Sequence, residues 1–139
     1  MPDVGAPPVT VLRDLMTTRL AETTPDATVT AAAAVMVAAS AGSAVVMQGR
    51  FLAGILTERD VLRAAASGED LASAPVSAWM TPDPQAASPE TPVADAAQIM
   101  LLNGFRHLPV VDGRVVCGVV SLRDLFAARI RRPLGSGPR

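Results

Sequence analysis

The stretch GILTERDVL at residues 54–62 runs from apolar residues typical of a buried strand into residues typical of a helix. Thr57 and Asp60 lie three positions apart within it, which is the spacing of a capping box at a helix N-terminus. The stretch GVVSLRDLF at residues 118–126 repeats the same order of residue types 64 positions further along the chain. The chain therefore carries either one helix-starting device twice or two copies of a ligand site.

The correspondence between the two stretches extends over most of the chain without a gap. Shifting the sequence by 64 positions aligns identical and similar residues from about residue 12 to about residue 66. The identical pairs include Met16 with Met80, Pro25 with Pro89, Met36 with Met100, Val46 with Val110, Gly49 with Gly113 and Gly54 with Gly118. The chain is a tandem duplication, so a fold for one half is a fold for both.

Each half predicts the same succession of elements. A short extended segment precedes a helix whose apolar residues follow helical spacing, as Val29, Ala32 and Met36 do in the first half. Two apolar strands follow, and the dipeptides at 48–49 and 112–113 predict the hairpin turns between them. A second helix begins at the threonine or serine of each stretch quoted above. The predicted fold class is α/β, with tandem β-α-β-β-α repeats.

These repeats divide the chain into two predicted domains. The first covers residues 10–67 and the second covers residues 76–132, with a linker at 68–75 between them. We expect the tail at 133–139 to be flexible, because chain ends are poorly ordered unless they are tied down. The uncharged run between residues 26 and 50 is long enough to span a membrane. Its content of alanine, threonine, serine and glycine favours a buried helix followed by a strand.

The charge balance limits the classes of partner. The chain has 12 basic and 13 acidic residues and a net charge of −1, whereas nucleic-acid and anionic-membrane surfaces need a basic excess. Every basic residue is arginine, so a phosphate would be met by arginine, by His107 or by backbone N–H groups. Because the N-terminus lacks the basic region of a secretory signal, we expect a cytoplasmic protein without a nucleic-acid or membrane partner.

The sequence offers little for catalysis. Cys117 and His107 are the single cysteine and the single histidine, and neither stands near a hydroxyl or acidic residue in a pattern that indicates a catalytic triad. Zinc-ligand spacings and glycine-rich phosphate loops are absent from the sequence. We therefore expect a binding module or a structural one, without catalytic residues, a metal or a required cofactor, rather than an enzyme.

The hydroxyl and acidic residues three positions apart have two interpretations. The two pairs are Thr57 with Asp60 and Ser121 with Asp124. As capping boxes they would satisfy N–H groups at a helix start and stabilise it by about 1 kcal/mol. Three features favour a ligand site: a glycine three positions before each hydroxyl, a helix N-terminus that attracts anions, and an arginine before each aspartate. A carboxylate one turn inside such a helix can accept two hydrogen bonds from a ribose diol.

Both stretches resemble the motif of cystathionine-β-synthase (CBS) domains, G-h-h-[TS]-x-x-D with h apolar, at the junction of the last strand and helix. The methionine-threonine pair near the start of each repeat and the proline before its first helix also resemble the family, and the resemblance covers residues 10–132. It implies a Bateman module, in which two domains pack about a pseudo-two-fold axis and leave two clefts. In the family these clefts bind adenosyl ligands such as AMP, ADP, ATP, S-adenosylmethionine or dinucleotides.

The resemblance also implies roles for individual residues. Two aspartates would bind ribose hydroxyls, and the hydroxyl residue three positions before each would contact phosphate or ribose. The arginine before each aspartate adds, from its own chemistry, the cation that a phosphate would want. These residues are Thr57, Arg59 and Asp60 in the first repeat and Ser121, Arg123 and Asp124 in the second. Other residues are expected around the base. They are Thr24, Ser43, Ala44 and Val45 with Asp60 in one cleft, and Ser88, His107 and Pro109 with Asp124 in the other.

The two clefts are not expected to be equal. Arg106 and His107 stand where the first repeat has Gly42 and Ser43, so cationic side chains are expected there beside Asp124 only. We expect a regulatory module that senses an adenosyl nucleotide, forms a homodimer and acts through an effector protein. The alternative is a structural or protein-interaction module with degenerate clefts, in which the paired residues are only helix caps.

Overall fold

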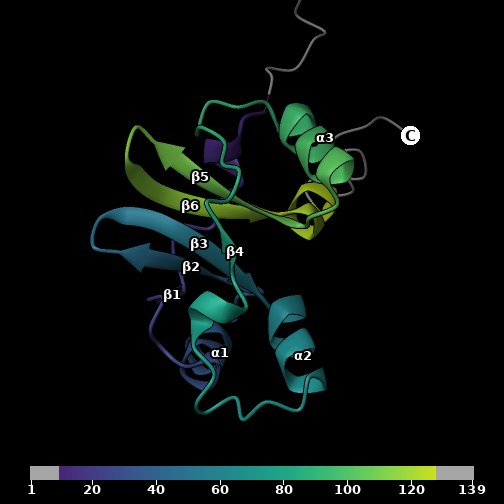
Figure 1. Ribbon diagram of the computed structural model, residues 1–139. Helices are drawn as coiled ribbons and strands as arrows, with labels where there is room; N and C mark the ends of the chain where they lie inside the picture. Colours follow the sequence, from purple (N-terminus) through teal and green to yellow (C-terminus); the bar gives the residue numbers. More distant parts are fainter. Residues whose placement is uncertain (1–9, 128–139) are drawn as a thin grey trace, which may run out of the picture.

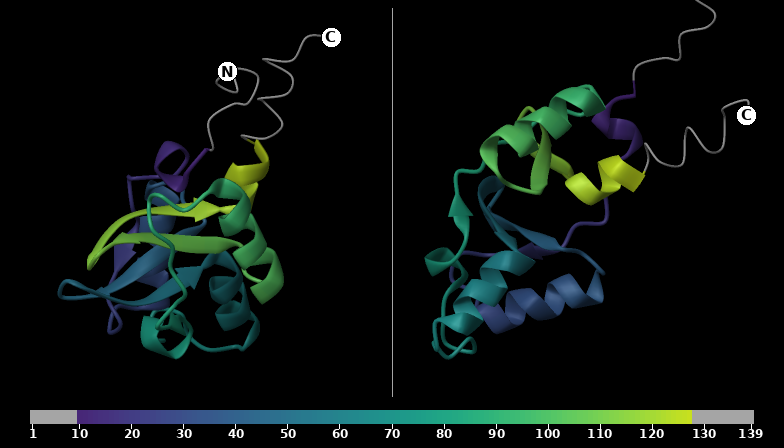
Figure 2. Two further views of the ribbon diagram at one scale, coloured as in Figure 1. Left: turned by 90° about the horizontal axis from the view of Figure 1, so that it is seen from above. Right: turned by 90° about the vertical axis from the view of Figure 1, so that its right-hand side faces the viewer.

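Two hydrophobic bodies, each a small sheet covered by helices, make up the computed structural model, which describes residues 10–127 (Figure 1). In chain order the elements are η1 (Leu12–Asp14), β1 (Glu22–Thr23), α1 (Val29–Ala38), β2 (Ser43–Gln48), β3 (Phe51–Thr57), α2 (Glu58–Ala66), η2 (Val76–Ala78), β4 (Thr81–Pro82), α3 (Val93–Asn103), β5 (His107–Asp112) and β6 (Val115–Ser121). A last helix begins at residue 122 and is described to residue 127. The sheets lie toward the middle, with α1 and α2 outside one and α3 and the last helix outside the other (Figure 2).

The element order repeats the predicted unit. In the first sheet the strand order is β1-β2-β3-β4, with β1 parallel to β2 and the other neighbours antiparallel. The second sheet contains β5 and β6, and two isolated bridges, Ala87 with Val110 and Thr17 with Val119, stand at the positions of β1 and β4. The α/β class and the twofold use of the unit are confirmed, although the first strand of the second repeat is reduced to one bridge.

The opening segment of each repeat pairs with the opposite repeat. β4 opens the second repeat, but it extends the sheet of the first, where Thr81 pairs with Ile55. Thr17 opens the first repeat, but it pairs with Val119 of the second. Each packed body thus contains most of one repeat together with the first residues of the other.

The exchanged segments also complete the hydrophobic cores. The Leu12 N–H donates to the Thr91 carbonyl at 3.0 Å, and the Val76 N–H donates to the Ala27 carbonyl at 2.8 Å. The Leu12 side chain is fully buried in the core of the second repeat, which contains Ala96, Met100, Leu108, Val110, Val120 and Leu125. Val76 is fully buried with Met36, Leu56 and other core residues of the first repeat. Full burial of a leucine or valine stabilises the fold by about 1.5–3 kcal/mol.

The glycine three positions before each hydroxyl permits this exchange. A Cβ atom at Gly54 would lie 2.8 Å from the Thr81 carbonyl oxygen, and one at Gly118 would lie 3.0 Å from the Thr17 carbonyl oxygen. Both separations are shorter than an ordinary contact with a Cβ atom, so the strand needs glycine there. The sequence favours a ligand beside each glycine, but the close neighbour in the structure is the methionine-threonine segment of the opposite repeat.

Both predicted hairpins are present, and each turn lies one residue later than expected. The last residues of β2 and β5 are Gln48 and Asp112, so the turns consist of residues 49–50 and 113–114. The glycine that begins each turn has a φ of 63°, in the left-handed region that glycine adopts at little cost.

The uncharged run between residues 26 and 50 forms α1 and β2, as the sequence predicts. In the described part of the chain, no helix combines the length and the apolar character needed to cross a membrane. The tail predicted at 133–139 lies outside the described residues.

Candidate functional site

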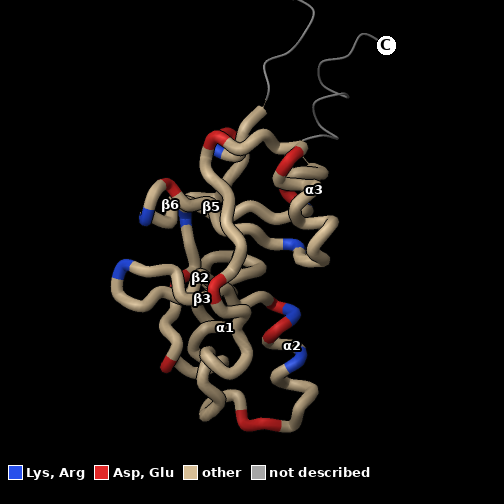
Figure 3. The backbone as a smooth tube through the Cα atoms, turned by 45° about the horizontal axis from the view of Figure 1, so that its top comes forward, with Lys and Arg blue, Asp and Glu red and all other residues tan. Residues whose placement is uncertain are grey.

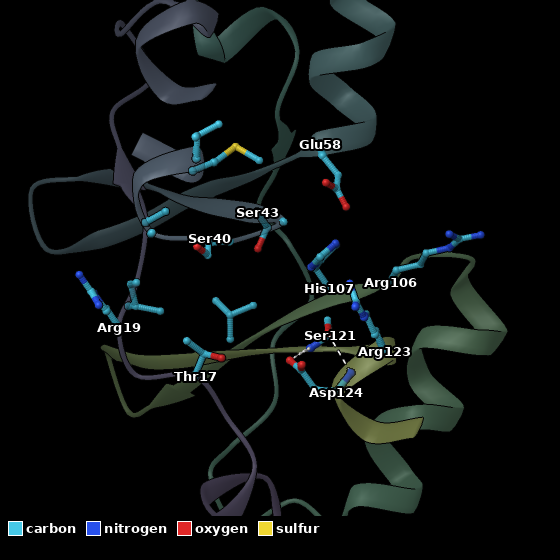
Figure 4. A pocket seen from close by; sticks show the side chains of 18 of the residues that line it. Thr17, Arg19, Ser40, Ser43, Glu58, Arg106, His107, Ser121, Arg123 and Asp124 are labelled. Carbon is cyan, nitrogen blue, oxygen red and sulfur yellow. Dashed lines mark hydrogen bonds between the residues drawn. The ribbon is translucent and has the colours of Figure 1, made fainter. Parts of the chain in front are cut away.

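Two clefts are lined by residues of both repeats. The Asp124 cleft, of about 790 Å³, is lined by Thr17, Arg19, Ser43, Ser121, Arg123 and Asp124 among others (Figure 4). The Asp60 cleft, of about 740 Å³, is lined by Thr57, Arg59, Asp60, Thr81, Gln85 and Phe105 among others. Small-molecule sites in proteins span roughly 300–1,000 Å³, so either cleft has room for a ligand of nucleotide size.

Asp60 closes a complete capping box at the start of α2. The Thr57 N–H donates to Oδ2 of Asp60 at 2.9 Å, and the Asp60 N–H donates to Oγ1 of Thr57 at 3.2 Å. The Thr57 hydroxyl donates to the same Oδ2 at 3.0 Å. The capping interpretation is therefore confirmed for the first repeat, and the same carboxylate also lines the cleft.

Asp124 makes the corresponding contacts in the second repeat. The Ser121 N–H donates to Oδ2 of Asp124 at 3.2 Å, and the Asp124 N–H donates to Oγ of Ser121 at 3.0 Å (dashed in Figure 4). These contacts use one oxygen of the carboxylate. Helix capping and cleft lining are therefore compatible, because the other oxygen is left for a different partner.

The second carboxylate oxygen distinguishes the two repeats. Oδ1 of Asp60 accepts a hydrogen bond from Nη1 of Arg63 at 3.1 Å, and the two residues form an ion pair. The Arg63 guanidinium lies 5.7 Å from the centre of the Trp79 ring. In the second repeat Ala127 stands at the position of Arg63, and among the described residues no group donates to Oδ1 of Asp124.

Arg106, His107 and Glu58 line both clefts. His107 begins β5 and lies against Gly42 of the other repeat, where a Cβ atom would be 3.0 Å from the ring carbon Cε1. Burial lowers the pKa of the His107 imidazole below its ordinary value of 6.5, and the Glu58 carboxylate opposes that shift. The ring is mostly neutral at pH 7, so it offers a hydrogen-bonding group between the clefts rather than a fixed charge.

The Asp124 cleft gathers arginines from three parts of the chain, Arg19, Arg106 and Arg123. The described residues form two salt bridges, and neither involves these arginines. Figure 3 shows acidic and basic residues interspersed along the described backbone. Within residues 10–127, no three His, Cys, Asp or Glu side chains gather closely enough to hold a metal ion.

Most of the predicted site residues lie at a cleft. Those that line one are Thr57, Arg59 and Asp60 in the Asp60 cleft, Ser43, Ser121, Arg123 and Asp124 in the Asp124 cleft, and Arg106 and His107 in both. Five others line neither cleft. Ala44, Val45 and Pro109 are buried within the two hairpins, and Thr24 and Ser88 are exposed with their hydroxyls bonded to nearby residues.

The pairing of residues between the clefts differs from the expected one. The sequence pairs Asp60 with the strand at 43–45, but Ser43 lines the Asp124 cleft, and Arg106 and His107 reach both clefts. The reason is that each cleft lies between the two bodies, so each aspartate faces the hairpin of the opposite repeat. Arg106 and His107 therefore do not distinguish one cleft from the other.

Several cleft residues were not predicted from the sequence. Thr17 and Thr81 line opposite clefts, and their signal was the methionine-threonine pair that recurs after 64 positions. Arg19 has no such signal, because its counterpart in the second repeat is Asp83. Phe105 follows the helix end at Gly104 and lies at the Asp60 cleft only because the two bodies face each other.

Comparison with known proteins identifies both repeats. The family model of the CBS domain matches residues 12–67 and 76–131. An uncharacterized 17.7 kDa protein of Acidianus ambivalens is 41% identical over 122 residues, which cover 86% of this chain and 73% of the relative. The CBS domain-containing protein YhcV of Bacillus subtilis is 36% identical over 115 residues, which cover 82% of this chain and 81% of the relative.

A solved structure supports the same assignment. The CBS domain protein PAE2072 from Pyrobaculum aerophilum, complexed with AMP, is 27% identical to this chain and superposes with a TM-score of 0.76. The match covers 83% of this chain and 89% of that protein. The likeness therefore extends over both repeats and over the way in which they pack.

Proposed function

Because this chain belongs to the CBS domain family and carries two such domains in tandem, we propose that it is a regulatory module that binds an adenosyl nucleotide between its repeats. One observation carries the proposal. The Asp124 carboxylate lines a cleft of about 790 Å³, and its capping box engages only one of its two oxygens. The other oxygen supplies the acceptor that a ribose needs.

The carboxylate suits a ribose because an ionised aspartate is an acceptor with several lone pairs and no donor. The 2′- and 3′-hydroxyls of a ribose are neighbouring donors, and both can point to one such group. Ser121 is hydrogen-bonded to Asp124 and Thr17 lines the same cleft, and both offer further hydroxyls (Figure 4). This end of the cleft is therefore the proposed ribose position.

The phosphates of the ligand are proposed to lie toward Arg106 and Arg123, which project on the same side of Asp124 in Figure 4. Guanidinium groups bind phosphate oxygens through paired hydrogen bonds, and this chain has no lysine that would compete for that role. Met36 and Ala33 of α1 add an apolar wall on which an adenine ring can pack. The AMP complex of PAE2072 supports this ligand class.

Self-association is part of the proposal. Leu62, Leu101, Leu102 and Phe126 are large apolar side chains on three helices, and each is more than half exposed. A second copy of the chain would remove this apolar surface from water. A ligand that binds one arrangement of such a homodimer more tightly than another would shift their populations, and an effector protein would read the change.

The second candidate function is a structural or protein-interaction module that binds no nucleotide. The observation that favours it is that both capping boxes are complete in the described structure. On this view the two aspartates stabilise their helices, and the clefts are only the space between two docked bodies.

Thermal unfolding of the full chain with AMP, ADP, ATP, S-adenosylmethionine and NADH distinguishes the two functions. A ligand present at 100 times its dissociation constant adds about 2.7 kcal/mol to the free energy of unfolding. We expect at least one of these compounds to raise the midpoint of the wild type. If none of them does so, the nucleotide proposal fails.

The matched variants are Asp124→Ala and Asp124→Asn. Alanine removes the cap and the ribose acceptor together, whereas asparagine keeps an oxygen that can accept from the Ser121 N–H. Under the nucleotide proposal both variants lose the ligand-induced shift. Under the structural alternative the alanine variant loses about 1 kcal/mol of stability, and no ligand raises the midpoint of the wild type or of either variant.

A further inference from the structure

We propose that Arg63 acts as a clamp that withholds the Asp60 carboxylate from a ribose, so that the Asp124 cleft alone takes the nucleoside. This inference rests on the function proposed above and concerns which of the two clefts performs it. It follows from the bonds that the two carboxylates make with their own chain.

Both oxygens of Asp60 are engaged by the protein. Oδ2 accepts from the Thr57 N–H at 2.9 Å and from the Thr57 hydroxyl at 3.0 Å, and Oδ1 accepts from Arg63 at 3.1 Å. The Asp60 side chain is only 9% exposed. These three bonds leave about one lone pair, so a ribose that brings two hydroxyls to the carboxylate must displace one of them, and the one from Arg63 is charge-assisted.

The clamp is itself held in place from outside α2. The Arg63 guanidinium lies over the Trp79 ring at 5.7 Å, within the range of a cation–π contact. The Trp79 indole N–H donates to Oε2 of Glu69 at 2.9 Å, which fixes the ring. Because Trp79 belongs to the opening segment of the second repeat, the exchange of segments between repeats supplies the surface on which Arg63 rests.

The second repeat lacks this arrangement at each matching position. Ala127 stands where Arg63 would be, and Leu15 of the first repeat stands where Trp79 would be. In the described part of the chain Oδ2 of Asp124 accepts from the Ser121 N–H, and Oδ1 accepts no hydrogen bond. A ribose at Oδ1 of Asp124 would displace no hydrogen bond made by the described residues.

The charges around the two carboxylates also favour an anionic ligand in the Asp124 cleft. Arg19 lines the Asp124 cleft, whereas its counterpart Asp83 carries the opposite charge and does not line the Asp60 cleft. Arg106 is common to both clefts. The Asp124 cleft thus combines an accessible carboxylate with one more cation for an anionic ligand, and we expect it to bind at least tenfold more tightly.

Equilibrium dialysis of the full chain with AMP, ATP and S-adenosylmethionine tests the clamp by counting sites. The wild type is expected to bind one equivalent per chain. Two variants, Arg63→Ala and Arg63→Met, are expected to bind a second equivalent. Methionine keeps an apolar stem over Trp79 but removes the guanidinium. Ala127→Arg places a guanidinium one turn from Asp124 on an exposed position and is expected to weaken the single wild-type site about tenfold or more.

Arg13→Ala is the matched control, because it removes an arginine from a surface ion pair with Glu90 that lines neither cleft. It is expected to bind one equivalent with unchanged affinity. Two equal sites in the wild type, or one site in both folded Arg63 variants, would overturn the clamp while leaving the nucleotide proposal intact. Binding of no probe by the wild type or any variant would instead overturn the proposed function, and the clamp with it.

Discussion

The Asp60 and Asp124 clefts are built from the same positions of the repeat, yet the surroundings of the two carboxylates differ. Both repeats keep the capping box, the glycine before it and the hairpin with its bulge. They differ at two positions, where the first repeat has Arg63 and Arg19 and the second repeat has Ala127 and Asp83. The two repeats carry the same residues where the path of the backbone depends on them. They carry different residues around the carboxylates. A shared scaffold therefore does not imply two equal sites.

The largest effect is expected from emptying the exchanged core positions. Leu12→Ala should lower the free energy of unfolding by about 2.7–5 kcal/mol, because it removes a fully buried side chain and leaves a cavity. Val76→Ala should cost less, about 2 kcal/mol, because it removes two carbons instead of three. Urea unfolding followed by circular dichroism measures both losses.

Val115→Ala is the control for this pair, because Val115 is 65% exposed and its truncation should change stability by less than about 0.5 kcal/mol. If Leu12→Ala cost no more than this control, the opening segment of the first repeat would not belong to the core of the second. The exchange of segments would then be wrong.

An intermediate effect is expected from adding a methyl group at the motif glycines. Gly54→Ala and Gly118→Ala should each destabilise the chain by about 1–3 kcal/mol, because the new Cβ meets a backbone carbonyl of the opposite repeat. The loss should be larger at Gly54, where the carbonyl oxygen would be 2.8 Å away instead of 3.0 Å. Differential scanning calorimetry gives the two midpoints.

Shortening Met80 tests the cause of this loss. Met80 is the flexible side chain closest to the new Cβ at Gly54, but the Thr81 carbonyl cannot move without its strand. The double variant Gly54→Ala, Met80→Ala is therefore expected to stay destabilised. Full recovery would show that the methionine, and not the backbone of the exchanged strand, requires the glycine.

The smallest effect is expected from His107, which has no histidine counterpart in the first repeat. Its pKa is lowered in the folded chain, so the unfolded chain binds more protons between that lowered pKa and about 6.5. Its contribution to stability is complete above about pH 6.5 and declines as the pH falls toward the folded pKa. Thermal midpoints at about pH 7.5 and about pH 5.5 should differ more for the wild type than for His107→Gln. If the two proteins showed the same change of midpoint with pH, the pKa of His107 would not be lowered, and the ring would be more solvated than the structure shows.

Local features of this chain were predictable because neighbours in sequence decide them. The capping boxes depend on residues three apart, and the hairpins depend on two apolar runs with a glycine between them. Each turn lies one residue later than predicted, because Gln48 and Asp112 still pair with the opposite strand. The sequence does not single out Arg63, because an arginine in the last turn of a helix is common. Only its contacts with Asp60 and Trp79 in the folded chain show that it holds the carboxylate.

The duplication, the α/β unit and the carboxylates that cap matching helices follow from the order of residues along the chain. That order leaves open which core each opening segment completes, because Leu12 and Val76 occupy equivalent positions and either core accepts an apolar side chain there. In the folded chain each segment docks on the opposite repeat, and each aspartate faces the opposite hairpin. Docking depends on contacts between residues far apart in the chain, and a repeated sequence satisfies the same local pattern in either arrangement.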